Sequence, residues 1–480
     1  MSSRKIVVVG ASEAGCRIAL AAQSAGHEVT LVDEHPQTLK DMTFDAPWFY
    51  GAGLPAALMN DNSIAQSVLE ASPALVECLD AGVDLRVSTV LWGAFRNGPN
   101  CMHIGTPKVG LVTRDGNEIL EHDDLIIATG VRDFVPSFKG WELPGVLGGK
   151  AAVALLDLYQ VFEGKALLVL GSSNLAMRVV RSALARGVTV VGVVEPGDAV
   201  EAGPEAADWL AEQGIPVHIR HVIAEATGKT AVIGARLVPL DGEPSREIAC
   251  DSIAVAIGTL PNIELPAAMG CRMRFAPEIA SWVPQISVQG ETSVEGVFWL
   301  SGATGADDAM CRAILDRIAG AEADNRPAGH AHAGPAPAEY IRTWVDTLHA
   351  TGGDDVTLCQ CETVSRGEFC DLTPPQYLGK GLRHAQSPVN RTGDEAAPRI
   401  NQDFVKRMTR VSMGHCQGKR CRDEAALALS LRFGIGLESI RPASYRFPLR
   451  PIDLGLIADD DETDEIRLNW QMWPYETRQD

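Results

Sequence analysis

Two copies of a strand–turn–helix–strand pattern constrain the fold of this chain most strongly. In the first copy, an apolar run at residues 5–9 leads into a glycine turn at 10–15, an alanine-rich helical stretch and a second apolar run at 29–33. The pattern recurs from residue 166, with a turn at 171–176 and a second run at 188–195. Short apolar runs joined through a helix are typical of parallel strands in βαβ units. The sequence therefore predicts an α/β protein with two Rossmann-like nucleotide-binding domains.

The first turn retains two of the three glycines that let a helix N-terminus approach a pyrophosphate. Gly10 and Gly15 fill the first and third places, and Ser12 fills the second. Asp33 ends the next strand, where a carboxylate can accept hydrogen bonds from ribose hydroxyls, and Glu34 follows it. These five residues predict a site for an adenine dinucleotide.

The second turn departs further from this pattern. Gly171 remains, while Ser173 and Ala176 replace the other two glycines, and Glu195 stands where a ribose acceptor would lie. Two interpretations stay open: a site for NAD(P), and a vestigial nucleotide fold that is retained as a scaffold.

Two cysteine pairs lie near the C-terminus, Cys359 with Cys361 and Cys416 with Cys421. Thiols in a reducing compartment are more often metal ligands than disulfides when they cluster. Two close pairs suit the four thiolates of a [2Fe–2S] cluster, and their spacing differs from the CxxC arms of structural zinc sites. We expect an iron–sulfur cluster; zinc and unligated core cysteines are the alternatives.

Composition and charge narrow the function. The formal net charge of −20 argues against binding to a phosphate backbone. No uninterrupted run of about 18 apolar residues occurs, which argues against a membrane span, and an apolar strand begins at residue 5. We therefore expect a cytoplasmic protein that binds no nucleic acid and does not span a membrane.

The chain divides by these patterns into a discontinuous first domain, a second domain, a cysteine domain and two connecting or terminal segments. We expect a FAD-type domain at 1–135 and 280–325, an NAD-type domain at 136–279, a linker at 326–350, a small, mainly helical [2Fe–2S] domain at 351–450 and an acidic tail at 451–480.

The chain resembles the FAD/NAD-type α subunit of bacterial hetero-oligomeric amino-acid dehydrogenases, a group that includes opine oxidase, D-hydroxyproline dehydrogenase and hydrogen cyanide synthase. The resemblance covers nearly the whole chain. Besides the two turns and Asp33, it rests on the segments 128–130, 140–145, 257–262, 292–297, 359–362 and 406–421. The last of these is similar to the [2Fe–2S] domain of bacterioferritin-associated ferredoxin.

This resemblance implies a FAD site that also includes Thr129, Gly130 and Gly302, and a [2Fe–2S] cluster on the four paired cysteines. The family usually has an aspartate where this chain has Ala303. Because that residue contacts the flavin side of FAD in the family, the pocket has two candidate occupants: FAD, and an adenine nucleotide such as ATP or ADP.

The resemblance further implies that the chain has no catalytic residue of its own. Its partner would be a flavin-containing β subunit that oxidises the substrate, with or without a small third subunit, and the resemblance leaves the electron acceptor open. The leading hypothesis is an electron-transfer and assembly subunit. The alternatives are a self-contained NAD(P)H-dependent ferredoxin-type reductase and a non-catalytic scaffold that holds a structural adenine nucleotide.

Overall fold

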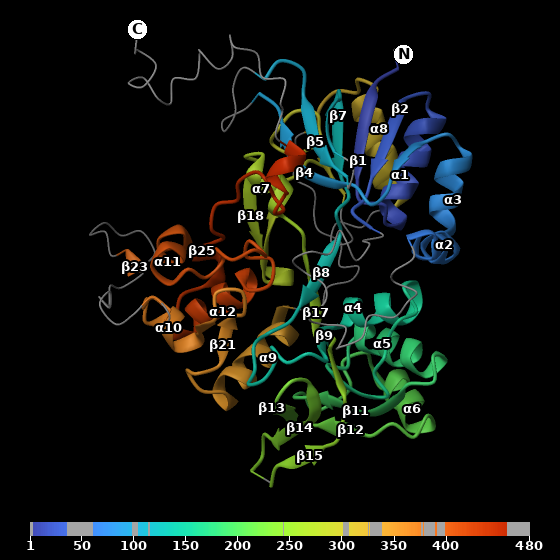
Figure 1. Cartoon of the computed structure of the whole chain (residues 1–480). Coiled ribbons are helices and arrows are strands. Elements are labelled where there is room, and N and C mark those ends of the chain that lie inside the picture. The colour runs from blue at the N-terminus through green and yellow to red at the C-terminus, as the bar shows by residue number, and fades with distance from the viewer. Residues whose placement is uncertain are drawn as a thin grey trace.

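The computed structural model describes residues 3–35, 61–97, 104–113, 116–242, 244–300, 307–324, 326, 338–375, 378, 389–390 and 399–457. Two five-stranded parallel sheets form its two larger parts, and the C-terminal helices lie beside them (Figure 1). The first sheet has the order β20-β7-β1-β2-β3. Its strands are β1 (Lys5–Val9), β2 (Glu28–Val32), β3 (Asp84–Arg86), β7 (Asp124–Ile127) and β20 (Val297–Trp299).

Strand β1 shows why this sheet forms. Its last four residues, Ile6 to Val9, are buried and apolar on both faces, as a central parallel strand requires. The helix that follows, α1 (Glu13–Ser24), begins at the N-cap Ser12 and ends before Gly26, whose φ of +87° suits a glycine.

Helices pack on one face of the first sheet, and mainly strands pack on the other. Helices α1, α3 (Pro73–Asp80) and α8 (Asp308–Ile318) pack on one face. An antiparallel sheet of β4 (Val90–Phe95), β5 (Lys108–Val112) and β6 (Asn117–Glu121) packs on the other, with α7 (Glu264–Ala268) and the hairpin of β18 (Met273–Ala276) and β19 (Ser281–Pro284). Helix α2 (Asp61–Ala71) precedes α3, and a 3₁₀ turn (Pro277–Ile279) joins β18 to β19.

The second sheet has the order β12-β11-β10-β16-β9. Its strands are β9 (Val146–Gly148), β10 (Ala166–Leu170), β11 (Thr189–Glu195), β12 (Val217–Ile219) and β16 (Ser252–Val255). Helices α4 (Gly149–Val153), α5 (Asn174–Ala185) and α6 (Pro204–Glu212) accompany it, with a π-helical turn at Ala154–Leu158. A three-stranded sheet of β13 (His221–Gly228), β14 (Val232–Pro239) and β15 (Arg246–Ile248) covers the opposite face from α5.

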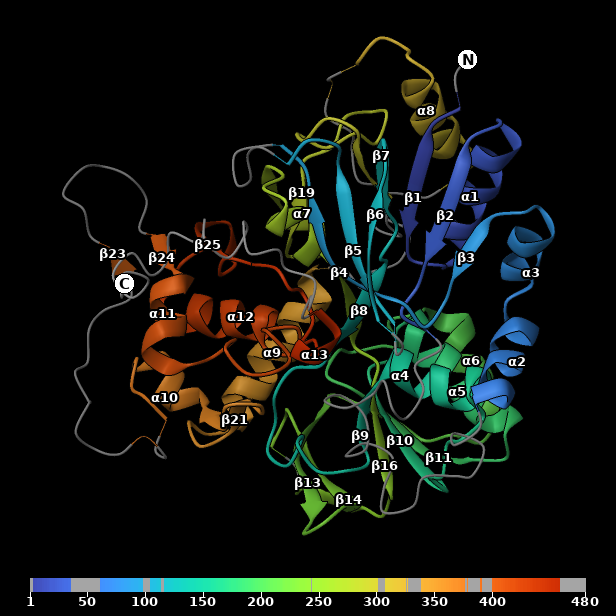
Figure 2. The ribbon, with the colours of Figure 1, turned by 45° about the horizontal axis from the view of Figure 1, so that its top comes forward.

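Two antiparallel strands, β8 (Val131–Phe134) and β17 (Gly258–Pro261), connect the two parallel-sheet units. The C-terminal part contains α9 (Ala338–Thr351), α10 (Arg366–Cys370), α11 (Gln402–Thr409), α12 (Arg422–Phe433), α13 (Leu454–Ile457) and a 3₁₀ turn (Leu437–Ser439). Its short strands are β21 (Thr357–Cys359), β22 (Val364–Ser365), β23 (Val389–Asn390), β24 (Arg399–Asn401) and β25 (Ile440–Arg441). Helices α9 to α12 lie together beside the two sheets in both ribbon views (Figures 1 and 2).

The predicted α/β fold with two parallel Rossmann-like sheets is confirmed. Residues 338–350, which the sequence places in a linker, lie instead in α9, because Ile341, Trp344 and Val345 bury an apolar face against the second unit. Among the described residues, no helix is both long enough and apolar enough to cross a membrane.

Candidate functional site

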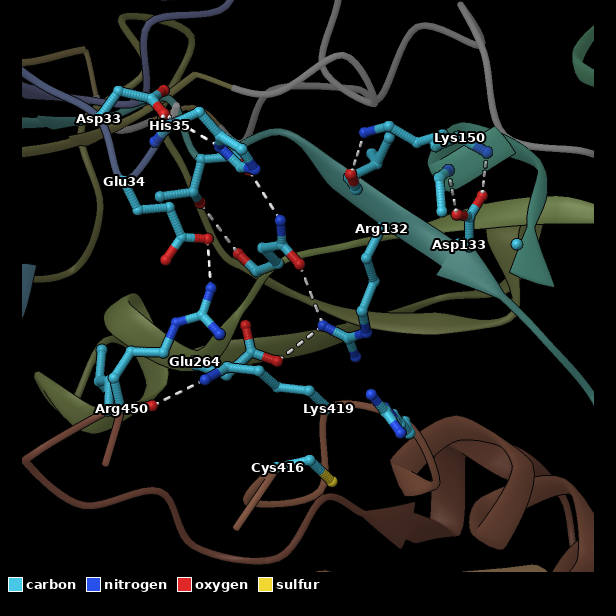
Figure 3. A pocket seen from close by; sticks show the side chains of 18 of the residues that line it. Asp33, Glu34, His35, Arg132, Asp133, Lys150, Glu264, Cys416, Lys419 and Arg450 are labelled. Carbon is cyan, nitrogen blue, oxygen red and sulfur yellow. Dashed lines mark hydrogen bonds and ion pairs between the residues drawn. The ribbon is translucent and has the colours of Figure 1, made fainter. Parts of the chain in front are cut away.

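A cavity of about 610 Å³ lies where the first unit, the second unit and the C-terminal part meet (Figure 3). Its lining comes from the first turn and the end of β2, from β8, from the start of α4, from α7 and from the cysteine segment. The lining residues that bear on its chemistry are Gly10, Asp33, Glu34, Thr129, Arg132, Asp133, Lys150, Glu264, Cys416, Lys419, Arg420 and Arg450.

The glycine turn that lines the cavity has no space for a larger residue at Gly10 or Gly15. Gly10 has a φ of +106°, and a Cβ there would overlap the carbonyl of Ala128. A Cβ at Gly15 would overlap the carbonyl of Gly10, so the helix could not pack so close to the turn. This is the close approach that the sequence predicts for a nucleotide turn.

Asp33 binds the turn itself. Its carboxylate accepts hydrogen bonds from the Ala11 N–H (2.5 Å) and the His35 N–H (2.7 Å), and it contacts the His35 ring at 3.1 Å. Burial by itself raises the pKa of Asp33, but the His35 ring and the two N–H groups outweigh it and hold that pKa below its usual value. The carboxylate is therefore kept ionised at the cavity wall.

Of the other residues that the sequence predicts to contact a cofactor, some line the cavity and others do not. Thr129 and Glu34 line the cavity. Ser12 is the exposed N-cap of α1 and accepts a hydrogen bond from the Gly15 N–H at 3.4 Å. The carbonyl of Gly130 accepts the Asn262 N–H at 3.1 Å. Gly302 and Ala303 lie outside the described residues.

The C-terminal segment closes one side of the cavity. Arg450 forms an ion pair with Glu34 (Figure 3). The segment is fixed beside it, because the Leu449 N–H donates to the Trp92 carbonyl and the Lys419 ammonium donates to the Leu449 carbonyl, both at 2.8 Å.

Asp133 and Lys150 lie beside each other and both line the cavity (Figure 3). The carboxylate of Asp133 accepts the N–H groups of Lys150 (2.8 Å) and Ala151 (3.1 Å), and the Lys150 ammonium donates to the Val131 carbonyl. Burial raises the pKa of Asp133 and lowers that of Lys150. The sequence analysis predicts neither Asp133 nor Lys150 as a site residue, since neither belongs to a motif. The one feature of the sequence that could have indicated them is that they follow the segment 128–130.

A buried ionic network joins the cavity wall to the cysteine domain. Glu264 of α7 accepts hydrogen bonds from Arg132 at 2.7 Å and from Arg422 at 3.0 Å, and Arg132 also pairs with Asp423 at 2.9 Å. Burial opposes ionisation of Glu264, but the two guanidinium groups outweigh it and lower its pKa to about 2. Because Arg422 follows Cys421 directly, the network fixes the start of α12 to the cavity.

The four predicted metal ligands form two hydrogen-bonded pairs, and one of the four, Cys416, lines the cavity. Cys359 is hydrogen-bonded to Cys421, and Cys361 to Cys416. The bond from Cys361, N–H groups of Arg420 and Gly418, and the Arg420 guanidinium lower the pKa of Cys416 against the effect of burial. The remaining cysteine of the domain, Cys370, lies in α10.

The chemical type of these side chains suits an iron–sulfur cluster, because thiolates are its usual ligands and backbone N–H groups donate hydrogen bonds to Cys359 and Cys416. In the part of the chain that the structure describes, however, no group of three or more His, Cys, Asp or Glu side chains is arranged to hold a metal ion. The cluster therefore stays a prediction.

In the second unit, polar groups that would bind a dinucleotide interact with each other. The Ser172 hydroxyl donates to the Glu195 carboxylate at 2.5 Å, and the Gly197 N–H donates to the same carboxylate at 2.8 Å. The hydroxyl of Ser173 donates to the Ala256 carbonyl at 3.0 Å.

Comparison with known proteins gives a consistent result. Residues 4–310 match the family described as pyridine nucleotide-disulphide oxidoreductase. An opine oxidase subunit from Rhizobium meliloti is 25% identical over 70% of this chain and 76% of its own length. Hydrogen cyanide synthase subunit HcnB of Pseudomonas aeruginosa is 27% identical over 69% of this chain and 75% of its own length. The structure of L-proline dehydrogenase from P. horikoshii has the same fold, with a TM-score of 0.61 and 18% identity over 95% of this chain and 80% of that one.

Proposed function

Because this chain belongs to the pyridine nucleotide-disulphide oxidoreductase family, we propose that it is the electron-transfer and assembly subunit of a hetero-oligomeric, flavin-dependent amino-acid or amine dehydrogenase. In this proposal the carbon–nitrogen bond of the substrate is oxidised on a partner subunit. Electrons then reach an acceptor by way of the cavity and the cysteine domain of this chain.

One observation carries the proposal: one cavity is lined both by a nucleotide-type turn and by Cys416. A group that filled the cavity would therefore contact the cysteine domain directly. The relatives support the assembly role, since the opine oxidase relative and HcnB are both named as subunits.

The cavity would hold FAD or an adenine nucleotide such as ATP or ADP. Gly10 leaves room for a close approach of a pyrophosphate. Asp33 already accepts two N–H groups, so it would meet a ribose hydroxyl with its remaining lone pairs. Lys150 and Arg420 also line the cavity and supply positive charge.

Cys359, Cys361, Cys416 and Cys421 would hold the [2Fe–2S] cluster, which supplies one-electron transfer when bound. The protein would orient the four thiolates and shield them from water. Cys359 and Cys421 belong to the hydrophobic core of the C-terminal domain, and Cys416, which lines the cavity, is 5% exposed. Hydrogen bonds from backbone N–H groups to sulfur tune the reduction potential of such a cluster.

Anaerobic purification of this chain with its partner subunits tests the proposal. We expect iron and acid-labile sulfide in equal amounts, and an adenine nucleotide or FAD released on denaturation. The Cys416→Ala complex should lose iron and reduce the acceptor slowly, while substrate still reduces the partner's flavin. Cys370→Ala is the matched control and should retain iron, since Cys370 belongs to neither pair. Zinc in place of iron, or full activity of an iron-free Cys416→Ala complex, would contradict the relay.

A further inference from the structure

The second nucleotide-type unit contains a side chain where a dinucleotide would bind. Tyr340, from the first turn of α9, is buried with 7% of its surface exposed. Its phenol oxygen accepts a hydrogen bond from the Ser172 N–H at 3.0 Å and donates one to the Glu195 carboxylate at 2.7 Å. Ser172 and Glu195 are themselves almost completely buried.

These two partners are the groups that a Rossmann-type unit offers to its ligand. Ser172 follows Gly171 in the turn after β10, where N–H groups face a pyrophosphate. Glu195 ends β11, where a carboxylate takes the ribose hydroxyls of NAD. The phenol oxygen therefore accepts a hydrogen bond from the Ser172 N–H, as a phosphate oxygen of NAD would. It donates one to the Glu195 carboxylate, as a ribose hydroxyl would.

Helix α9 holds Tyr340 in this position through its own packing. Ile341, Trp344, Val345 and Leu348 are each about 1% exposed or less, and they share a hydrophobic core with β10, β13 and β16 of the second unit. Figure 1 shows α9 between the C-terminal helices and β13. Withdrawal of Tyr340 would expose this apolar face to water.

We propose that Tyr340 takes the place of the nucleotide in the second unit. In this position it prevents NAD(P) from binding there, and it joins Ser172 and Glu195 of the second unit to the C-terminal domain. Burial and the adjacent Glu195 carboxylate raise the pKa of Tyr340, so the phenol keeps the proton that it donates. The inference concerns only the second unit and does not depend on the occupant of the large cavity.

Binding of NADH to the full chain tests the proposal, with isothermal titration as the readout. We expect wild-type protein to show no binding that depends on Glu195. Tyr340→Ala removes both hydrogen bonds and the ring, which leaves Ser172 and Glu195 without this partner. The affinity of this variant for NADH should exceed any wild-type affinity by about tenfold or more, since the bound nucleotide would pair with both groups. Adding Glu195→Gln to this variant should abolish the gain, which assigns it to the second unit rather than to the large cavity.

Ile341→Ala is the matched control, because it loosens the same helix without freeing Ser172 or Glu195; it should gain no NADH binding. Wild-type binding that Glu195→Gln weakens would overturn the proposal, as would a folded Tyr340→Ala protein without any gain. If Tyr340→Ala does not fold, photolabelling of wild-type protein with 2-azidoadenine NAD⁺ decides: labelled peptides from 171–176 or 195–203 overturn the proposal, and their absence supports it.

Discussion

Asp33 and Cys416 line the same cavity, one directly after the second strand of the chain and the other within the C-terminal cysteine segment. A nucleotide-type turn and one thiol of the cysteine domain thus line one cavity. Substitutions at each wall of the cavity should have separate and measurable effects.

Gly10→Ala should remove the bound nucleotide. The added Cβ would overlap the Ala128 carbonyl, and the backbone would be strained at a φ of +106°, which by itself costs about 1–3 kcal/mol. The measurement is the nucleotide content of purified protein together with its thermal midpoint. Gly116→Ala is the control, because no atom lies within 4 Å of its added Cβ; equal effects of the two substitutions would contradict the assignment of the turn.

Glu264→Gln should destabilise the protein by up to about 3–5 kcal/mol, because it removes one of the two carboxylates, Glu264 and Asp423, that pair with the guanidinium groups of Arg132 and Arg422. Urea unfolding followed by circular dichroism measures this. Glu278→Gln offers a matched control, since its contact with Arg274 is a 4.0 Å pair near the surface and should contribute less than about 1 kcal/mol.

Arg450→Ala should speed the release of adenine nucleotide from the cavity and weaken its binding a few-fold. The Arg450–Glu34 pair is partly exposed, with 23% and 31% of the two side chains accessible. Its loss should therefore reduce the free energy of nucleotide binding by no more than about 1 kcal/mol. Stopped-flow displacement of a fluorescent ADP measures the rate. Arg432→Ala removes a surface pair with Asp371 and should leave the rate unchanged.

The Asp33–His35 pair should give the protein a mildly acidic optimum of stability. The pKa of Asp33 is lowered in the folded state, so its contribution is present above about pH 3.9 and is lost as the pH falls through the folded value. Asp33 raises the pKa of His35 against the partial desolvation of the ring, so the contribution of His35 is complete below about pH 6.5 and is lost as the pH rises through the folded value.

Both contributions are therefore complete between about pH 4 and 6.5. Thermal midpoints of wild type and His35→Asn should differ most in this window and converge above it, with a small difference because the His35 side chain is 52% exposed. A constant difference across pH 4–9 would show that the pair does not titrate as proposed.

Local patterns were enough to predict the two parallel sheets. The runs at Lys5–Val9 and Ala166–Leu170 are short and apolar and each precedes a glycine turn, so neighbouring residues alone determine strand, turn and helix. The positions of Gly10 and Asp33 in the cavity follow from the same βαβ geometry.

The contacts between distant segments could not be predicted in this way. Tyr340 belongs to a helix whose apolar spacing indicates only a buried face, and nothing local indicates that its hydroxyl meets Glu195. Likewise, Arg132 and Arg422 meet at Glu264 because three separate elements converge there. Such polar contacts depend on tertiary packing, which single-sequence periodicity does not encode.

The pair between Glu34 and Arg450 also has a consequence for biosynthesis. A ribosome delivers the nucleotide turn first and Arg450 hundreds of residues later, after both sheets can have formed. The cavity therefore gains its wall at Arg450 only after the residues of both sheets have been synthesised. A cofactor that binds the glycine turn before this point is then retained by a segment that is made long after the turn itself.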